Sequence, residues 1–141
     1  INVASRAVGV AQAAFDAAMA YAQERETFGQ PIFKHQAIQF KLAEMATKLQ
    51  AARLMTYDAA ARADAGERVD MEAGMAKLFA SEAAYEIATD ALRIHGGNGY
   101  TTEYPVERYF RDTPLMIIGE GTSEIQKMVI ARKLLDRYSV E

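Results

Sequence analysis

The chain has 141 residues, which is the size of one domain and long enough to bury a hydrophobic core. Its net charge of -3 and pI near 5.5 create no basic surface field, so nucleic acid is not an expected partner. No apolar run approaches the ~20 residues of a membrane span, and the absence of cysteine excludes disulfides and thiolate metal sites.

The first predicted element is a helix over residues 1 to about 26, which is apolar or small on nearly every side, as interior helices are. It begins at Ile1 without an initiator methionine or a signal peptide. We therefore interpret the chain as a fragment of a longer protein that is not secreted.

Two further long helices are predicted next. In residues 35 to about 65, apolar residues recur at alternating spacings of four and three, and Gly66 ends the helix. Asp70 is the predicted N-cap of a helix that runs to about His95, with a flat face of alanine and isoleucine that permits close helix approach. Gly96 and Gly97 stop it as a left-handed C-cap.

The rest of the chain holds a short turn or helix over 106–111 and a final helix from about Thr122, which we expect to carry Ile125, Met128, Val129 and Leu135 inward. All three prolines are expected between the long helices. No strand-like alternation, hairpin signal or internal repeat competes with this pattern. Four long helices joined by short links predict an all-α fold, an antiparallel up-down four-helix bundle.

A carboxylate lies between two glycines just before the last helix, in Gly119-Glu120-Gly121. Because neither neighbour has a β-carbon, another molecule can approach the Glu120 backbone closely. Ser123 and Gln126 have the spacing of a capping box. An acid at such an ordered turn is well placed to act as a catalytic base. The alternative is that Glu120 only complements the macrodipole of the helix that follows.

The link after the first helix, residues 25–32, supplies Arg25, Thr27 and Phe28, and His35 and Gln36 follow at the next helix start. Arginine pairs with phosphate, and an aromatic ring packs on another flat ring. The residues therefore suit a ligand with a phosphate and a flat ring. The alternative is a rigid helix connection in which Arg25 neutralises a helix C-terminus.

The link after the third helix has three glycines in four residues: Gly96, Gly97 and Gly99. A helix stop needs one, so the surplus favours a backbone contact with a phosphate or another chain. No strand precedes the glycines, so this is not a dinucleotide-binding fingerprint. We interpret His95 as a structural histidine at the helix end.

Metal and hydrolase chemistry have no support in the sequence. A di-iron bundle uses Glu-x-x-His, and neither His35 nor His95 has glutamate three residues earlier. No nucleophile-elbow pattern occurs either.

Taken together, the links resemble the C-terminal helical domain of the acyl-CoA dehydrogenase family. The matching blocks are Arg25-x-x-Phe28-Gly29-x-Pro31-Ile32 with Gln36, then 96–100, 103–107, 111–112 and 120–126. They occur in the family's order and spacing, and the helices around them agree, so the resemblance covers essentially the whole chain.

The resemblance implies an FAD enzyme that oxidises an acyl-CoA thioester to its trans-2-enoyl-CoA. It implies that Glu120 is the base that removes the α-proton and that Gly121 contacts the substrate. Thr122 and Glu124 match positions on the FAD of the same subunit. Eight positions match those that reach the FAD of a neighbouring subunit: Arg25, Thr27, Phe28, His35, Gln36, Arg93, Gly96 and Gly97. The implied assembly is a homo-oligomer, typically a tetramer.

The resemblance also implies an electron-transfer flavoprotein as the acceptor and a location in the bacterial cytoplasm or the mitochondrial matrix. An acyl-CoA oxidase of the same fold and a catalytically silent helical assembly domain are the alternatives. The family's N-terminal helical and central β domains are absent from this chain, so we expect little activity from it alone.

Three positions depart from the family's pattern. Gly119 stands where an aromatic residue is common, which would reshape the acyl pocket. Arg93 stands where glutamine is common, which puts its FAD contact in doubt. Some members place the base on the first helix of this domain, at a position just before Ile1. Because Glu120 occupies the commoner position, we do not expect that alternative.

Overall fold

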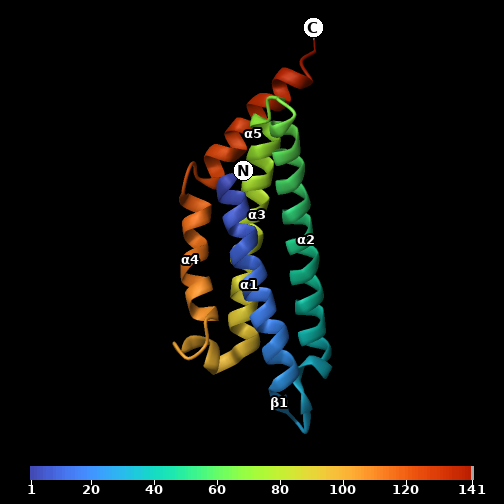
Figure 1. The fold of residues 1–141 in the computed structure, drawn as a ribbon, viewed down its shortest axis with the longest axis vertical. Helices are drawn as coiled ribbons and strands as arrows, with labels where there is room; N and C mark the ends of the chain where they lie inside the picture. Colours follow the sequence, from blue (N-terminus) through green and yellow to red (C-terminus); the bar gives the residue numbers. More distant parts are fainter. Residues whose placement is uncertain (141) are drawn as a thin grey trace.

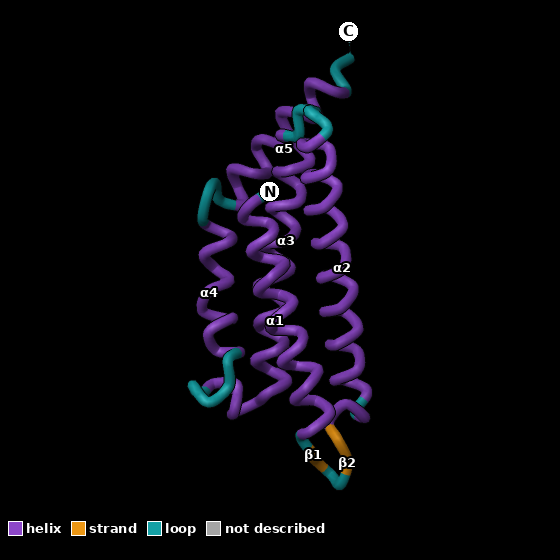
Figure 2. Tube along the Cα trace, viewed as in Figure 1, coloured by secondary structure: helices purple, strands orange, loops and turns teal. Residues whose placement is uncertain are grey.

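The computed structural model describes residues 1–140, and its regular structure is almost entirely helical, which confirms the predicted all-α class. The α-helices are α1 (Asn2–Glu24), α2 (Gln36–Asp64), α3 (Asp70–His95), α4 (Val106–Ile118) and α5 (Ser123–Arg137). Two 3₁₀ turns occur, η1 (Ile32–Lys34) and η2 (Gly96–Tyr100). A two-residue antiparallel hairpin, β1 (Glu26–Thr27) with β2 (Gln30–Pro31), was not predicted and lies at the lower end of the molecule in Figure 2.

The helices α1, α2, α3 and α4 lie lengthwise and alternate in direction, and α5 lies across the upper end (Figure 1). Helix α3 packs against all four other helices and is the centre of the fold. The sequence predicted that the last helix would be the fourth long member of the bundle. Instead α4, expected to be a short turn or helix, lies beside α1 and α3.

Alanine sets the close packing of α1 on α3. Six alanines of α1 and five of α3 are at most 1% exposed: Ala4, Ala7, Ala11, Ala14, Ala18 and Ala22, with Ala76, Ala80, Ala84, Ala88 and Ala91. Alanine favours helix and brings little side-chain bulk between helices. Of the predicted inner positions of α2, Leu42, Met45, Leu49 and Ala52 are buried, as expected, and Ile38 is half-buried against the core.

Two predictions about helix starts are wrong. Val69 rather than Asp70 is the N-cap of α3, and the Asp70 carboxylate instead pairs with Arg68 Nε at 2.7 Å. At the start of α5, Thr122 Oγ1 accepts the Ile125 N–H at 3.4 Å, so Thr122 is the N-cap. Ser123 does not form the expected capping box, because its hydroxyl donates to Glu82 Oε1 at 2.7 Å.

Pro114 lies inside α4 and not between helices as predicted. Proline has no N–H and leaves the carbonyl four residues earlier, that of Phe110, without its helical donor. The buried Thr113 hydroxyl donates to this same carbonyl at 3.1 Å. This side-chain bond offsets the lost one, and α4 therefore continues to Ile118.

Three of the four α5 side chains that were predicted to point inward do not, whereas the fourth, Val129, is half-buried. Ile125, Met128 and Leu135 are 48%, 61% and 73% exposed, and Ser123 is the buried residue of this helix. None of the helices within residues 1–140 is long and apolar enough to cross a membrane. In the same residues, no three histidine, aspartate or glutamate side chains gather as a metal site would require.

Candidate functional site

The turn that carries Glu120 has an unusual backbone. Glu120 is exposed and has a φ of +53°, and Gly121 follows with a φ of +95°. Within residues 1–140, Phe28 and Glu120 are the non-glycine residues with positive φ, and both are candidate site residues from the sequence. A left-handed non-glycine residue costs of order 1 kcal/mol and persists only where its surroundings enforce it.

Gly119 fits this turn because the backbone leaves no room for a side chain. Its N–H donates to the Leu115 carbonyl at 2.7 Å. A β-carbon on Gly119 would lie 2.9 Å from that same carbonyl oxygen, so any larger residue would require the backbone to shift. The main chain of this turn therefore favours glycine over an aromatic residue at this position.

Helix α3 holds the turn through two side chains. Lys77 Nζ donates to the Ile117 carbonyl at 3.0 Å and to the Gly121 carbonyl at 2.7 Å. Lys77 is only 4% exposed, and burial lowers the pKa of its ammonium group, against the raising effect of Glu82 and Glu124. Glu82 is the second side chain and accepts the Ser123 hydroxyl.

The sequence analysis missed Lys77. A lysine on the alanine-rich face of a helix was the available signal, since such a position would otherwise be apolar. Its partners lie 40 and 44 residues further along the chain, so no local pattern indicates what the ammonium group binds.

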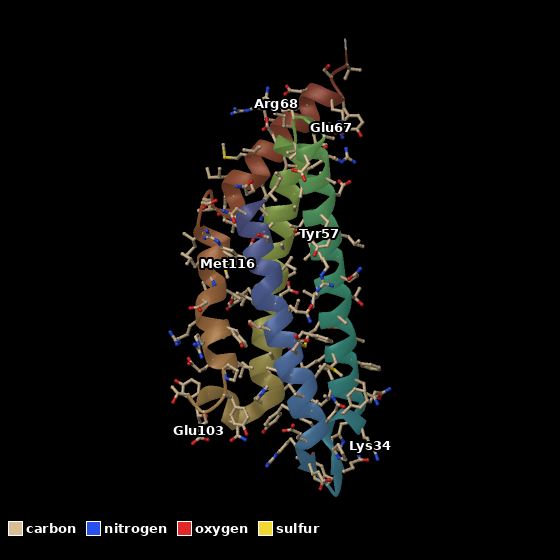
Figure 3. The ribbon with its side chains drawn as sticks, viewed as in Figure 1. Lys34, Tyr57, Glu67, Arg68, Glu103 and Met116 are labelled. Atoms are coloured by element: carbon tan, nitrogen blue, oxygen red, sulfur yellow. The ribbon has the colours of Figure 1, made fainter. Side chains whose placement is uncertain are left out.

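Two clefts flank the turn. One, of about 480 Å³, is lined by α1 (Val3, Arg6 and Val10), by α4 (Asp112, Leu115 and Met116) and by Gly119 and Glu120. Met116, on α4, is among the side chains marked in Figure 3. The other, of about 520 Å³, is lined by Glu120, Lys77 and Gln126 together with the cations Arg68, Arg132 and Lys133. The Glu120 carboxylate therefore borders a largely apolar cleft on one side and a basic one on the other.

The link after α1 and the link after α3 meet at the opposite end of the bundle, where they form a cleft that we call the distal cleft. This cleft, of about 400 Å³, brings together Arg25 and Thr27 from the first link and Gly96 and Gly97 from the second. His95 and Tyr21 form part of its wall. Four of the eight predicted positions thus border one cleft, although the two links are far apart in sequence.

The hairpin beside this cleft orders His35. Gln30 Nε2 lies 3.4 Å from His35 Nδ1, and His35 Nε2 lies 2.9 Å from Thr27 Oγ1. These two contacts hold the His35 ring between Gln30 and Thr27. Phe28, at the hairpin tip, is 96% exposed and stands edge-on to the His35 ring, with 6.0 Å between centroids.

The other two predicted positions, like Phe28 and His35, lie outside the cleft lining. Gln36 is the exposed first residue of α2. Arg93 is exposed on α3 and lies 3.6 Å from the Asp90 carboxylate.

The three glycines of the second link have different reasons to be glycine. Gly96 ends α3 with a φ of +59°. A β-carbon on Gly99 would lie 2.5 Å from the Leu92 carbonyl oxygen, so Gly99 permits η2 to pack on α3. Gly97 is exposed, has no positive φ and has open space where a β-carbon would be. Only Gly97 remains without a reason inside this chain, which fits a contact with another molecule.

His95 is a structural residue, in agreement with the sequence interpretation. It is 4% exposed, its Nδ1–H donates to the Ala91 carbonyl at 2.8 Å, and its ring stacks on Tyr21 with 4.1 Å between centroids. Burial lowers the pKa of His95, and the bond to Ala91 opposes this effect.

This lowered pKa predicts that the domain loses stability in mild acid. As the pH falls through about 6.5, His95 takes up a proton more readily in the unfolded chain than in the folded one, so protons favour unfolding. This contribution to the free energy of unfolding is complete above about pH 6.5 and falls as the pH drops. Urea unfolding at about pH 5.5 and about pH 7.5 measures it. We expect a smaller pH difference for His95→Phe than for the wild type, and equal differences would contradict the assignment.

The two groups of candidate residues are too far apart to form one compact site. Val3 borders the Glu120 turn and Arg25 borders the distal cleft, at opposite ends of α1. At 1.5 Å per residue, the helix separates them by about 33 Å. Figure 1 shows the turn between α4 and α5 in the upper half of the molecule and the hairpin at its lower end.

Comparison with known proteins identifies related sequences and structures. The profile of a family described as "Acyl-CoA dehydrogenase, C-terminal domain" matches residues 1–135. A 3-(aryl)acrylate reductase of Clostridium sporogenes is 57% identical over 96% of this chain. A probable acyl-CoA dehydrogenase of Bacillus subtilis is 58% identical, also over 96% of it. The chain spans 36% of the length of each of these two relatives. The butyryl-CoA dehydrogenase structure from Megasphaera elsdenii superposes with a TM-score of 0.93 at 44% identity, covering 94% of this chain and 35% of that one.

Proposed function

The chain belongs to the acyl-CoA dehydrogenase family, and on this premise we propose that it serves an FAD-dependent α,β-dehydrogenation of an acyl-CoA thioester, with Glu120 as the α-proton base. The observation that carries the proposal is the turn itself. An exposed glutamate is held at a φ of +53° between two glycines, at the edge of a cleft of about 480 Å³.

The chemistry of the reaction explains why such a turn is useful. The α-C–H of a thioester is a weak acid, so its removal needs a well-placed carboxylate and a polarised carbonyl. Within residues 1–140 the Glu120 N–H has no hydrogen-bond partner and is free to donate to a thioester oxygen. Glu120 would then supply both the base and one donor, and Gly121 would allow the substrate to approach.

The residues at both ends of the bundle fit FAD. FAD, when bound, accepts the β-hydrogen as hydride. Near the turn, Thr122 and Glu124 offer polar groups beside Glu120. At the distal cleft, Arg25 suits a phosphate, and Gly97 leaves its backbone open to close approach. Thr27, Phe28, His35, Gln36, Arg93 and Gly96 are the other proposed distal contacts.

The separation of the two groups supports an assembly in which neighbouring chains share each cofactor site. A distance of about 33 Å along α1 is large for one compact site on one chain. We therefore propose that the distal group contacts the FAD of another subunit in a homo-oligomer, in keeping with the expected tetramer. Exposed aromatic residues on α2 also support a subunit interface at this helix. Phe40 and Tyr57 are 58% and 63% exposed, and Tyr57 is labelled in Figure 3.

The names of the relatives bear on the substrate. The Clostridium sporogenes protein is named for an arylacrylate and the Megasphaera elsdenii protein for butyryl-CoA. Both names concern a carboxylic acid derivative with an α,β carbon pair, which agrees with the proposed oxidation at the α,β carbon–carbon bond. We propose an electron-transfer flavoprotein as the electron acceptor, with oxygen as the acceptor in the oxidase alternative.

The domain proposal predicts a difference between the full-length protein and this chain. The full-length protein, given an acyl-CoA and an artificial electron acceptor, should form the enoyl-CoA that lacks two hydrogens, detected by mass spectrometry. The 141-residue chain alone should form little or none, because it provides only the helical part of the site. Turnover by the isolated chain would contradict the need for further domains. Failure of the full-length protein with every acyl-CoA tested would contradict the reaction.

A further inference from the structure

We propose that Lys77 is a positioning residue that fixes the Glu120 carboxylate for proton abstraction by holding the carbonyl groups on both sides of the turn. This inference rests on the proposed function of Glu120. It concerns a residue that the comparison with relatives does not assign.

The contacts of Lys77 bracket the turn. Its ammonium group, on α3, binds the Ile117 carbonyl before Glu120 and the Gly121 carbonyl after it, at 3.0 and 2.7 Å. One ammonium group thus links the end of α4 to the segment that leads into α5. Residues 118–120, which it spans, include the left-handed Glu120.

The burial of Lys77 carries a desolvation cost in free energy. A buried ammonium group loses its hydration, and here its hydrogen bonds go to backbone carbonyls rather than to a salt-bridge partner. A methionine would fill a similar volume without that loss. Packing alone therefore does not explain a lysine at this position, whereas a need to hold two carbonyl groups does.

A further hydrogen bond, between Glu82 of α3 and Ser123, also holds the turn against α3. Ser123 is 2% exposed and bonds to Glu82, five residues after Lys77 on α3. Helix α3 therefore holds the chain before and after Glu120, and leaves the Glu120 side chain exposed beside both clefts. Lys77 contacts the main chain of the turn and acts on the reaction only through the position of Glu120.

The test is Lys77→Met in the full-length, FAD-loaded enzyme. Flavin reduction by an acyl-CoA, followed by anaerobic stopped flow and normalised to bound FAD, should be at least about 10-fold slower, because misplacement of a base by about 1 Å has large effects on rate. The dissociation constant of an enoyl-CoA product should change less than about 2-fold, since Lys77 does not line the largely apolar cleft of about 480 Å³. A purely structural role would instead lower FAD content and binding together.

Two controls separate the possible failures. Lys48→Met removes a lysine that pairs with Glu86 away from the turn, at 2.5 Å, and should leave the reduction rate unchanged. Lys77→Gln keeps a polar group that is too short to reach both carbonyls, and it replaces the methionine variant if that one does not assemble.

A reduction rate within about 2-fold of wild type in the Lys77 variants would overturn the positioning role. If Glu120→Gln also retained that rate, the proposed function itself would fail. If Glu120→Gln lost it, the role of Lys77 alone would fail.

Discussion

Replacing Glu120 with glutamine in the full-length protein is expected to slow flavin reduction by an acyl-CoA at least about 100-fold, with FAD still bound. Glutamine has nearly the same shape as glutamate but cannot accept the α-proton. Glu120 is exposed and its carboxylate makes no hydrogen bond or ion pair within residues 1–140, so the substitution should leave the fold intact. Stopped-flow spectroscopy measures the rate, and the visible flavin absorbance of the purified protein measures bound FAD.

The matched control is Glu67→Gln in the link between α2 and α3, where an exposed carboxylate lies 3.9 Å from Arg62. It removes the same charge from a residue that lines neither cleft beside the Glu120 turn, and it should leave the reduction rate unchanged. Full activity of Glu120→Gln would favour the catalytically silent assembly domain. An equal loss in both variants would mean that net charge, and not the base, governs the rate.

Adding one methyl group at Gly99 is expected to destabilise the domain by about 1–3 kcal/mol, the usual cost of overpacking. A β-carbon there would lie 2.5 Å from the Leu92 carbonyl oxygen and 3.0 Å from the His95 β-carbon. The first neighbour is backbone at the end of α3 and cannot rotate away. Relief therefore requires η2 to move away from the helix. Urea unfolding of Gly99→Ala against the wild type measures the loss.

Gly97→Ala is the matched variant two residues away, where the added methyl group meets open space. Its free energy of unfolding should stay within about 0.5 kcal/mol of wild type. If Gly97 contacts the FAD of a neighbouring subunit, the same variant should lose bound FAD in the assembled enzyme. Equal destabilisation of both variants would contradict the packing explanation for Gly99, and full FAD content in Gly97→Ala would contradict the contact.

The sequence predicted the long helices and the links better than it predicted which helices pack together. The inward positions of α2 and α3 follow a regular spacing, so local pattern was enough to find them. Helix α5 shows the limit of this reasoning. Ile125, Met128 and Leu135 read as a core face, yet all three are exposed in this chain. A face covered by another chain or domain has the same apolar pattern as a face buried within one.

The candidate site could be predicted in its residues but not in its geometry. Glu120 was identifiable from its two glycine neighbours, whereas its positive φ was not, because glutamate gives no local signal for that conformation. Lys77 was missed because its partners are 40 and 44 residues away. The sequence could not separate the structural role of Gly99 from those of its glycine neighbours, because that role depends on the close approach of Gly99 to the Leu92 carbonyl.

The most direct test of the central claim is anaerobic mixing of the full-length protein with a panel of acyl-CoAs, each with and without deuterium at the α-carbon. If Glu120 abstracts the α-proton, at least one acyl-CoA should bleach the visible flavin absorbance, and α-deuteration should slow that bleaching. Bleaching by none of the panel, or at a rate that is indifferent to α-deuterium and persists in Glu120→Gln, would contradict it.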